Sequence, residues 1–265
     1  MTRPESDTVQ GALSTGAADR LHALDVFDTV PSTNTYLIDQ SPPEPGQYRV
    51  AIAGHQTAGR GRNENRWHSA PESSLCLSLS YTFRKTPSNL PPLTLALGVS
   101  VAELLTEAGV AGIKLKWPND IYVQDAKLGG ILTEVQQRQR VSVVAGIGIN
   151  LDVDEEMASA ISDQLAPPIG LKHVMDSPPE RNILSAQVIE AWVQAIDDFE
   201  VSGFEAFSER FNSFDWLNGR TIVADTPQGT FEGKAAGIDT SGALLLNDGD
   251  TKHQIVSGTI RHVRQ

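Results

Sequence analysis

The residues best suited to chemistry lie in one short stretch of the 265-residue chain, residues 54–67, where glycine and arginine are concentrated. Gly59 and Gly61 allow the backbone to approach a ligand closely or to adopt a positive φ. Arg60 and Arg62 each carry a planar guanidinium that can bind a carboxylate or a phosphate through two hydrogen bonds. Such segments are also typical of ordinary solvated turns. A functional role for this stretch would be the binding of a small anion.

The charge of the chain makes this stretch an exception. The formal net charge is −12, from 33 acidic and 21 basic residues, yet Arg60, Arg62 and Arg66 stand within seven residues. Binding of nucleic acid needs positive charge clustered over a surface, because it must neutralise many phosphates. The pattern therefore indicates a small anionic ligand and no nucleic-acid partner.

The flanking elements must hold the stretch in place. Residues 49–53 form a short apolar run, and apolar and small polar side chains alternate along residues 75–81, so we expect the stretch to connect two strands. No Gly-Lys-Ser/Thr follows, so it is not a P-loop, and the third glycine of a Rossmann fingerprint is missing. The stretch is therefore neither of these two phosphate-binding motifs.

Five motifs resemble the biotin protein ligase family, biotin–[acetyl-CoA-carboxylase] ligases, in that family's order and spacing. They are Ser32-Thr33-Asn34, residues 56–62 with Trp67, Lys116-Trp117-Pro118-Asn119-Asp120, residues 127–132 and residues 146–150. The resemblance covers roughly residues 24–263. It implies an α+β fold in which a mixed β-sheet catalytic domain with packed helices is followed by a small C-terminal SH3-like β-barrel.

The resemblance also implies a two-step reaction. The carboxylate of biotin attacks the α-phosphate of ATP, which gives biotinyl-5′-AMP and pyrophosphate, and a specific lysine of a biotin carboxyl carrier domain then attacks this mixed anhydride. The implied cofactor is Mg²⁺ bound with ATP. The implied protein partner is the carrier domain of an acetyl-CoA carboxylase or pyruvate carboxylase type enzyme.

Site residues follow from the same resemblance. The catalytic candidates are Lys127, Arg62 and Asp120. The biotin-binding candidates are Ser32, Thr33, Asn34, Gln56, Gly59, Arg60, Gly61, Arg62, Lys127 and Gly130. The nucleotide-binding candidates are Arg60, Arg62, Arg66, Trp67, Asn119 and Asn150. The resemblance assigns no protein ligand to the metal.

The residue types fit these roles. Lys127 precedes Gly129 and Gly130, whose missing side chains would admit a flat ligand, so it is a candidate for holding the biotin carboxylate and polarising its carbonyl. A lysine beside a turn is otherwise usually a solvated residue. Arg60, Arg62 and Lys127, with Mg²⁺, would offset the repulsion between the two anions that meet in the first step.

The stretch departs from the family at one place. After Gly-Arg-Gly-Arg these ligases commonly carry another Gly-Arg pair, whereas this chain has Glu64 and Asn65 there and Arg66 one residue later. An acidic side chain beside a triphosphate would weaken ATP binding unless it faces solvent or helps to hold Mg²⁺. We expect Arg66 to take over part of the phosphate contact and Glu64 to point away.

The domain prediction has three parts. Residues 1–20 lack periodicity and predict a disordered, mobile tail. Some biotin ligases carry an N-terminal winged helix-turn-helix and act as repressors, and this tail is too short for such a reader, so we expect a ligase only. Residues 21–217 should form the catalytic domain, and residues 218–265, with short strands and glycine turns, the SH3-like domain.

Several elements can be placed by pattern. Pro31-Ser32-Thr33-Asn34 should start a helix with a hydroxyl cap, and the apolar stripe from Leu93 to Leu104 predicts a helix that ends near Gly109. Residues 113–117 read as a half-buried strand, residues 121–135 as a hairpin and residues 141–149 as a strand buried on both faces.

The single cysteine, Cys76, excludes an internal disulfide, and its place in an alternating strand favours a buried structural thiol. A cytoplasmic protein fits this cysteine content. No long uninterrupted apolar run indicates a signal peptide or a membrane span, so no membrane partner is expected.

Two other functions stay open on the sequence. Lipoate ligases and octanoyl transferases share this fold, and Lys127 would suit either, although residues 59–62 and 116–120 favour biotin. The second is a regulator that binds a small molecule without catalysis. The complete set of activating residues counts against it.

Overall fold

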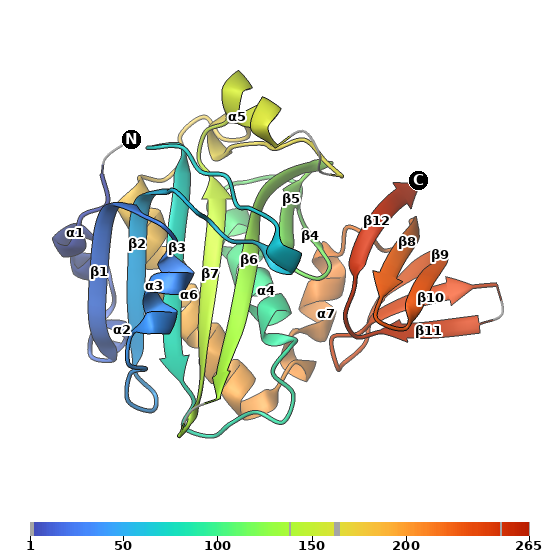
Figure 1. Cartoon of the computed structure of the whole chain (residues 1–265), viewed down its shortest axis with the longest axis horizontal. Helices are drawn as coiled ribbons and strands as arrows, with labels where there is room; N and C mark the ends of the chain where they lie inside the picture. Colours follow the sequence, from blue (N-terminus) through green and yellow to red (C-terminus); the bar gives the residue numbers. More distant parts are fainter. Residues whose placement is uncertain (1–2, 138, 162–164, 250, 265) are drawn as a thin grey trace.

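The computed structural model describes residues 3–137, 139–161, 165–249 and 251–264. A seven-stranded mixed sheet forms the larger part of the molecule, in the order β1-β2-β3-β7-β6-β5-β4 (Figure 1). Its strands are β1 (Leu21–Val30), β2 (Tyr48–Gln56), β3 (Ser74–Thr82), β4 (Ile113–Lys116), β5 (Asp120–Val123), β6 (Ala126–Gln137) and β7 (Val141–Asn150). β1 and β2 run parallel, and the other neighbouring strands run antiparallel.

Helices cover both faces of this sheet. They are α3 (Thr33–Asp39), α4 (Leu93–Glu107), α6 (Arg181–Ser202) and α7 (Glu205–Phe214). α4 and α6 lie behind the sheet and α3 lies in front of it (Figure 1). Because successive strand residues point to opposite faces, Val50 and Ile52 of β2 join the main core, whereas Ala51 packs with Leu37 of α3 in a separate small cluster.

The predicted start of α3 and the predicted end of α4 are confirmed. Ser32 is the N-cap of α3, and its hydroxyl accepts a hydrogen bond from the backbone N–H of Thr35 at 3.4 Å. Gly109 follows the last residues of α4 at φ +97°, the left-handed backbone that favours glycine after a helix. α3 therefore begins at the edge of the site described below.

Residues 3–20 differ from the expected disordered tail. They contain two short helices, α1 (Ser6–Gly11) and α2 (Thr15–Ala18), and α1 packs against α6 and β1. Val9, Leu13 and Ala17 recur every fourth residue, and Val9 is fully buried. Three apolar residues at helical spacing dock this segment, although its composition alone indicated a tail.

A second, five-stranded antiparallel sheet follows, in the order β11-β10-β9-β8-β12. Its strands are β8 (Thr221–Thr226), β9 (Gly229–Ile238), β10 (Leu244–Asp248), β11 (Thr251–Ile255) and β12 (Thr259–Arg264). The two sheets together confirm the α+β prediction. The SH3-like description and the boundary between residues 217 and 218 stay predictions.

Trp117 joins the two sheets. Its side chain is buried, and its indole N–H donates to the carbonyl oxygen of Gly242 at 3.2 Å. A Cβ added to Gly242 would lie 2.7 Å from Pro92, which shows how closely this turn approaches the start of α4. The second sheet is thus held beside residues 117–119, which form one wall of the site.

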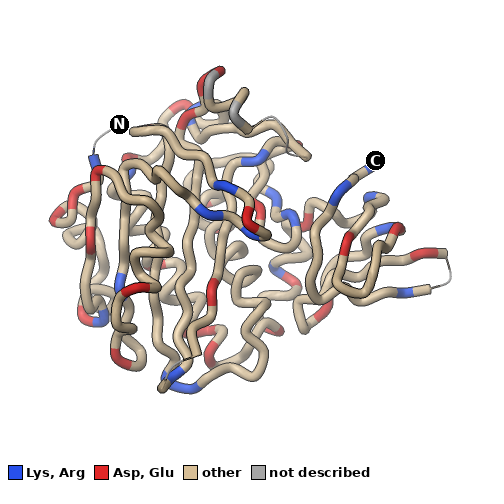
Figure 2. The backbone as a smooth tube through the Cα atoms, in the orientation of Figure 1, with Lys and Arg blue, Asp and Glu red and all other residues tan. Residues whose placement is uncertain are grey.

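Acidic and basic positions are interspersed over both sheets (Figure 2). Among the described residues, no helix combines the length and the apolar character needed to cross a bilayer.

Candidate active site

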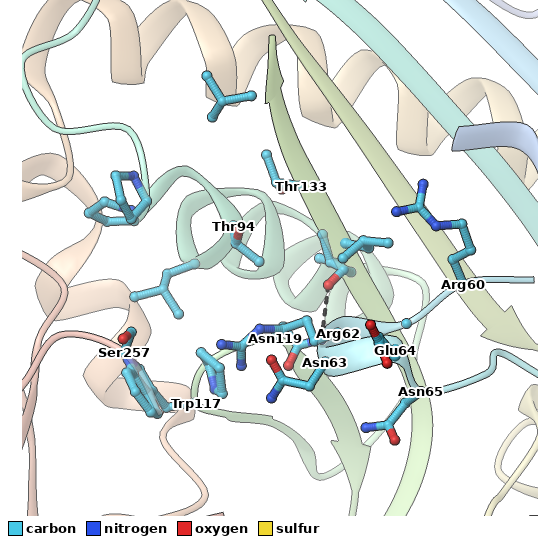
Figure 3. Close-up of a pocket in the computed structure, with 18 of the residues that line it drawn as sticks. Arg60, Arg62, Asn63, Glu64, Asn65, Thr94, Trp117, Asn119, Thr133 and Ser257 are labelled. Carbon is cyan, nitrogen blue, oxygen red and sulfur yellow. Dashed lines mark hydrogen bonds between the residues drawn. The ribbon is translucent and has the colours of Figure 1, made fainter. Parts of the chain in front are cut away.

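Two adjoining cavities lie beside the glycine- and arginine-rich loop. The smaller, about 420 Å³, is bounded by the start of α3, the loop, and strands β3, β5, β6 and β7. The larger, about 1090 Å³, lies between the loop, the start of α4, β6 and two turns of the C-terminal sheet (Figure 3). Of the predicted site residues, all except Gly59 and Asn150 line the smaller cavity.

Three charged side chains form one wall of the smaller cavity. Asp120 Oδ1 lies 2.7 Å from Lys127 Nζ, and its Oδ2 lies 3.2 Å from Lys116 Nζ. Burial acts to raise the pKa of Asp120, but the charges of Lys127 and Lys116 outweigh it and hold that pKa below its ordinary value. Two ammonium groups therefore face one carboxylate, and the cluster keeps a net positive charge for an anionic ligand.

A chain of uncharged polar groups forms another wall. The side-chain oxygen of Gln56 accepts hydrogen bonds from the backbone N–H of Thr33 at 2.7 Å and from its hydroxyl at 3.1 Å. The Thr33 and Ser78 hydroxyls lie 2.7 Å apart, and Ser78 donates to Asn34 Oδ1 at 2.6 Å. These groups are buried, so the wall offers fixed, neutral hydrogen-bonding partners.

Two glycines of β7 make room for these side chains. A Cβ at Gly146 would lie 2.0 Å from Asn34 Oδ1, and a Cβ at Gly148 would lie 2.2 Å from the Trp67 ring. Gly129 has a different role from the one expected, since its Cβ would lie 2.5 Å from the carbonyl oxygen of Gly148 in the neighbouring strand. It permits close strand pairing, and Gly130 is the member of the pair that lines the smaller cavity.

The loop itself is an ordered hairpin. Trp67 N–H donates to the carbonyl oxygen of Gly59 at 3.0 Å, and Gly61 N–H donates to that of Asn65 at 2.7 Å. The 3₁₀ turn η1 (Arg62–Glu64) closes its tip. Glu64 has φ +62°, a left-handed backbone that favours glycine, which is the residue type that the resembled family commonly carries there.

The arginines of the loop point in different directions. Arg60 pairs with Glu134 of β6 through two hydrogen bonds of 2.7 and 3.1 Å, and Arg66 donates to the carbonyl oxygen of Thr57 at 2.7 Å. Arg62 extends toward the C-terminal sheet and donates to the carbonyl oxygen of Gly258 at 3.4 Å (Figure 3). Burial lowers the pKa of Arg62, and the nearby charge of Asp120 offsets part of this effect.

The two asparagines predicted to bind the nucleotide anchor the backbone. Asn119 donates to the carbonyl oxygen of Ile131 at 2.9 Å and lines both cavities. Asn150 donates to the carbonyl oxygens of Lys127 and Ile169, each at 3.3 Å, and fixes the start of β6. Within the described residues its Oδ1 is buried without a hydrogen-bond partner, and Asn150 lines neither cavity. A role toward adenine stays a prediction.

Several residues at the site were not predicted from the sequence, among them Ser78, Glu134 and Thr259. Ser78 belongs to the polar wall, Glu134 accepts a hydrogen bond from Asn34 of that wall at 2.9 Å, and Thr259 accepts a hydrogen bond from Asn63 of the loop at 2.8 Å. Ser78 lies opposite Gly146 in the β3–β7 pairing. The small polar residues that alternate along β3 were a usable signal for Ser78. No local pattern marks Glu134 or Thr259.

No group of three or more His, Cys, Asp or Glu side chains suited to hold a metal ion occurs in the part of the chain that the structure describes. Asp120, the carboxylate that lines the smaller cavity beside Lys127, is already paired with two lysines. Mg²⁺ often binds through one or two carboxylates, waters and substrate phosphates. This donor set suits an ion that arrives with a nucleotide better than an ion held by the protein alone.

Two family models match the chain. The Biotin/lipoate A/B protein ligase family matches residues 26–154, and the Biotin protein ligase C terminal domain matches residues 218–263. Their order agrees with the two sheets.

Curated relatives and solved structures extend this match. The bifunctional ligase/repressor BirA of Salmonella typhimurium is 32% identical over 240 residues, which cover 86% of this chain and 72% of that protein. A biotin–[acetyl-CoA-carboxylase] ligase of Mycobacterium tuberculosis is 28% identical over 260 residues, 94% of this chain and 92% of that protein. The biotin protein ligase from Aquifex aeolicus in complex with biotin and ATP superposes with a TM-score of 0.75 at 27% identity, over 93% of this chain and 99% of that one.

Proposed function

The chain belongs to the biotin protein ligase family, and we propose that it is an ATP-dependent ligase which activates biotin as biotinyl-5′-AMP and transfers it to a lysine of a biotin-dependent carboxylase. One observation carries the proposal furthest. The smaller cavity combines a neutral polar wall with a cationic wall. Biotin has the matching chemistry, because its ureido ring is neutral and polar and its side chain ends in a carboxylate.

The first step joins two anions, so its barrier is largely electrostatic. Lys127 would hold the biotin carboxylate, and Arg62 would stabilise the charge that develops on the α-phosphate as pyrophosphate leaves. Asp120 holds the Lys127 ammonium in place through their 2.7 Å ion pair. Mg²⁺, which we include in the proposal as an ion bound with ATP, would supply further positive charge at the phosphates.

The second step transfers the biotinyl group. A neutral acceptor lysine attacks the acyl carbon, AMP leaves, and the lysine proton passes to solvent or to the departing phosphate. Because the pKa of Asp120 is held low, this carboxylate is a weak base. Its role in our proposal is therefore to position Lys127 and Lys116. The acceptor would be a biotin carboxyl carrier domain of the acetyl-CoA carboxylase or pyruvate carboxylase type. In our proposal the protein acts in the cytoplasm.

The ordered loop fits the retention of a reactive intermediate. Arg62 and Asn63 hydrogen-bond to residues 258 and 259 of the C-terminal sheet, so that sheet helps to hold the loop beside the smaller cavity. Keeping water from the mixed anhydride would prevent its hydrolysis before the acceptor arrives.

Exchange of radiolabelled pyrophosphate into ATP tests the first step directly. We expect exchange that depends on biotin and is much slower with lipoate or octanoate. Lipoate ligation, the second candidate, shares the first of the two family models, whereas the second model describes the C-terminal domain of biotin protein ligases. Equal or faster exchange with lipoate would contradict the proposal. Transfer is then measured with a purified carrier domain, against the same domain with its acceptor lysine changed to arginine.

A further inference from the structure

Glu134 of β6 lies at the centre of contacts that the proposed reaction does not use. Its Oε1 accepts a hydrogen bond from Arg60 Nη2 at 2.7 Å. Its Oε2 accepts hydrogen bonds from Arg60 Nη1 at 3.1 Å and from Asn34 Nδ2 at 2.9 Å. One carboxylate therefore joins the loop to the start of α3, two segments separated by strand β2.

The contact with Glu134 fixes which way the Asn34 amide points. A carboxylate only accepts hydrogen bonds, so Asn34 must direct its NH₂ group toward Glu134. The same NH₂ group donates to the carbonyl oxygen of Leu132 at 3.2 Å. Both amide hydrogens are then in use, and Asn34 Oδ1 must point the other way, toward Ser78.

The orientation of the Asn34 amide determines which groups donate and which accept along the rest of the polar wall. Asn34 Oδ1 can only accept, so the Ser78 hydroxyl donates its single hydrogen to it at 2.6 Å. Ser78 then has no hydrogen left for Thr33, so the Thr33 hydroxyl is the donor in the 2.7 Å contact, and it shares its one hydrogen between Ser78 and Gln56 Oε1, which lies 3.1 Å away. The backbone N–H of Thr33 stays on the side-chain oxygen of Gln56 at 2.7 Å. Every hydrogen bond from Thr33 to Glu134 thus has one direction, which is set by the two acceptors of the Asn34 NH₂ group, the Glu134 carboxylate at 2.9 Å and the Leu132 carbonyl at 3.2 Å.

Without that carboxylate only the Leu132 carbonyl, at 3.2 Å, would hold the Asn34 amide in this orientation, and the amide could turn over. Its NH₂ group would then face Ser78, and the hydroxyl hydrogens of the wall would reverse. Asn34 Oδ1 packs closely over Gly146, since a Cβ there would lie 2.0 Å from it, so β7 restricts movement of the amide on that side. A ligand that matches the present donors and acceptors would lose its partners.

We propose that Glu134 is a positioning residue for biotin: it sets the hydrogen-bond direction of the polar wall through Asn34 and ties the loop to that wall through Arg60. This inference rests on the proposed function, since biotin is the ligand whose ureido group would form hydrogen bonds with the polar wall. Glu134 does not line either cavity, so its effect is transmitted through Asn34 and Arg60. The ATP site is not predicted to need it.

The test is Glu134→Gln, which keeps the size of the side chain but can present an NH₂ group to the two donors. We expect the Kd for biotin, measured by calorimetry without ATP, and the KM for biotin to rise about tenfold. The reason is that a hydrogen bond to a charged group is lost, and 1.4 kcal/mol corresponds to tenfold. The KM for ATP and kcat at saturating biotin should change less than threefold. Glu134→Asp, which keeps an acceptor-only carboxylate, should recover part of the affinity.

Glu103→Gln is the matched control. Glu103 forms a similar two-bond pair with Arg210 on the helices behind the sheet, and the variant should leave the biotin Kd unchanged. A biotin Kd for Glu134→Gln within twofold of wild type would overturn the inference, and so would an equal loss in the control. Failure of the proposed function would look different, because the unmodified protein would then show no biotin-dependent pyrophosphate exchange.

Discussion

Asp215, at the junction of the two sheets, should make the stability of the protein depend on pH. It follows α7, its backbone pairs with Leu115 of β4, and its side chain is 8% exposed. Burial raises the pKa of Asp215 to about 6, although hydrogen bonds from the backbone of Leu217 and Asn218 and the charge of Lys114 act in the opposite direction. The folded protein therefore disfavours the ionised carboxylate.

The sign and size follow from linkage. A folded-state pKa above the unfolded value means that Asp215 costs nothing below pH 3.8, and that a penalty grows as pH rises through about 6. The difference between 3.8 and about 6 is about 2 units, and each unit is worth about 1.4 kcal/mol, so the penalty reaches at most about 3 kcal/mol above pH 7.

Asp215→Asn removes this titration and keeps the shape of the side chain. Its oxygen can still accept from Leu217 N–H, as Asp215 Oδ1 does at 2.9 Å. We expect the variant to have a higher Tm than wild type at pH 8, by up to about 5–10 °C for a chain of this size, and an equal Tm near pH 4. Thermal unfolding followed by circular dichroism across this range measures the difference.

Asp125→Asn is the control of opposite sign. Hydrogen bonds from Arg220 and Trp216 lower the pKa of the exposed Asp125 carboxyl, so ionisation there is favoured in the fold. Its replacement should lower the Tm slightly or leave it unchanged at pH 8. An increase in Tm for Asp215→Asn that is the same at pH 4 and pH 8, or no increase at either, would refute the reasoning.

Three further predictions concern the reaction. Lys127→Ala should slow adenylate formation about a hundredfold or more with folding intact, since a charge-assisted contact in a closed site is worth about 2–4 kcal/mol; near-normal single-turnover rates would exclude this role. Arg62→Ala should release biotinyl-5′-AMP, which is measured as biotin attached to an unrelated bystander protein; labelling equal to wild type would contradict a retention role. Arg66→Ala should raise the ATP KM about tenfold and Asn65→Arg should lower it by a similar factor, at saturating biotin and Mg²⁺. An unchanged KM for Arg66→Ala would show that this arginine is only a solvated loop residue.

The site residues that could be predicted are those that belong to short, contiguous sequence motifs. Ser32 was recognisable as a helix cap from its local sequence, and Lys127 and Asp120 came from two motifs whose strands are neighbours. The same motifs did not reveal that Lys116, Asp120 and Lys127 form one ion-paired cluster. That requires β4 to pair with β5 beside the predicted hairpin of β5 and β6, and the sequence does not specify the pairing of β4.

The missed residues depend on contacts between distant segments. Glu134 reaches Arg60 across 74 positions, and Asn63 reaches Thr259 across 196. Neither contact changes any local pattern, because Glu134 is one of several polar residues in the second half of β6. Residues 3–20 were misread for a related reason: Val9 is buried only because α6 lies beside it. The composition of a segment indicates whether it could fold by itself. It does not show which distant segments of the chain the fold places beside it.

The two adjoining cavities have a consequence for inhibitor design. Residues 60–63 of the loop line both of them, so this ordered loop separates a small polar chamber from a larger cleft that is also lined by two turns of the C-terminal sheet. A bivalent compound, with one fragment in each cavity and a linker past the loop, would bind its second fragment at a high effective concentration. Its affinity would then exceed that of either fragment by much more than the added contacts alone provide. Selectivity would come from the larger cleft, where the walls are side chains such as Asn89, Val135 and Val256 that the proposed chemistry does not use.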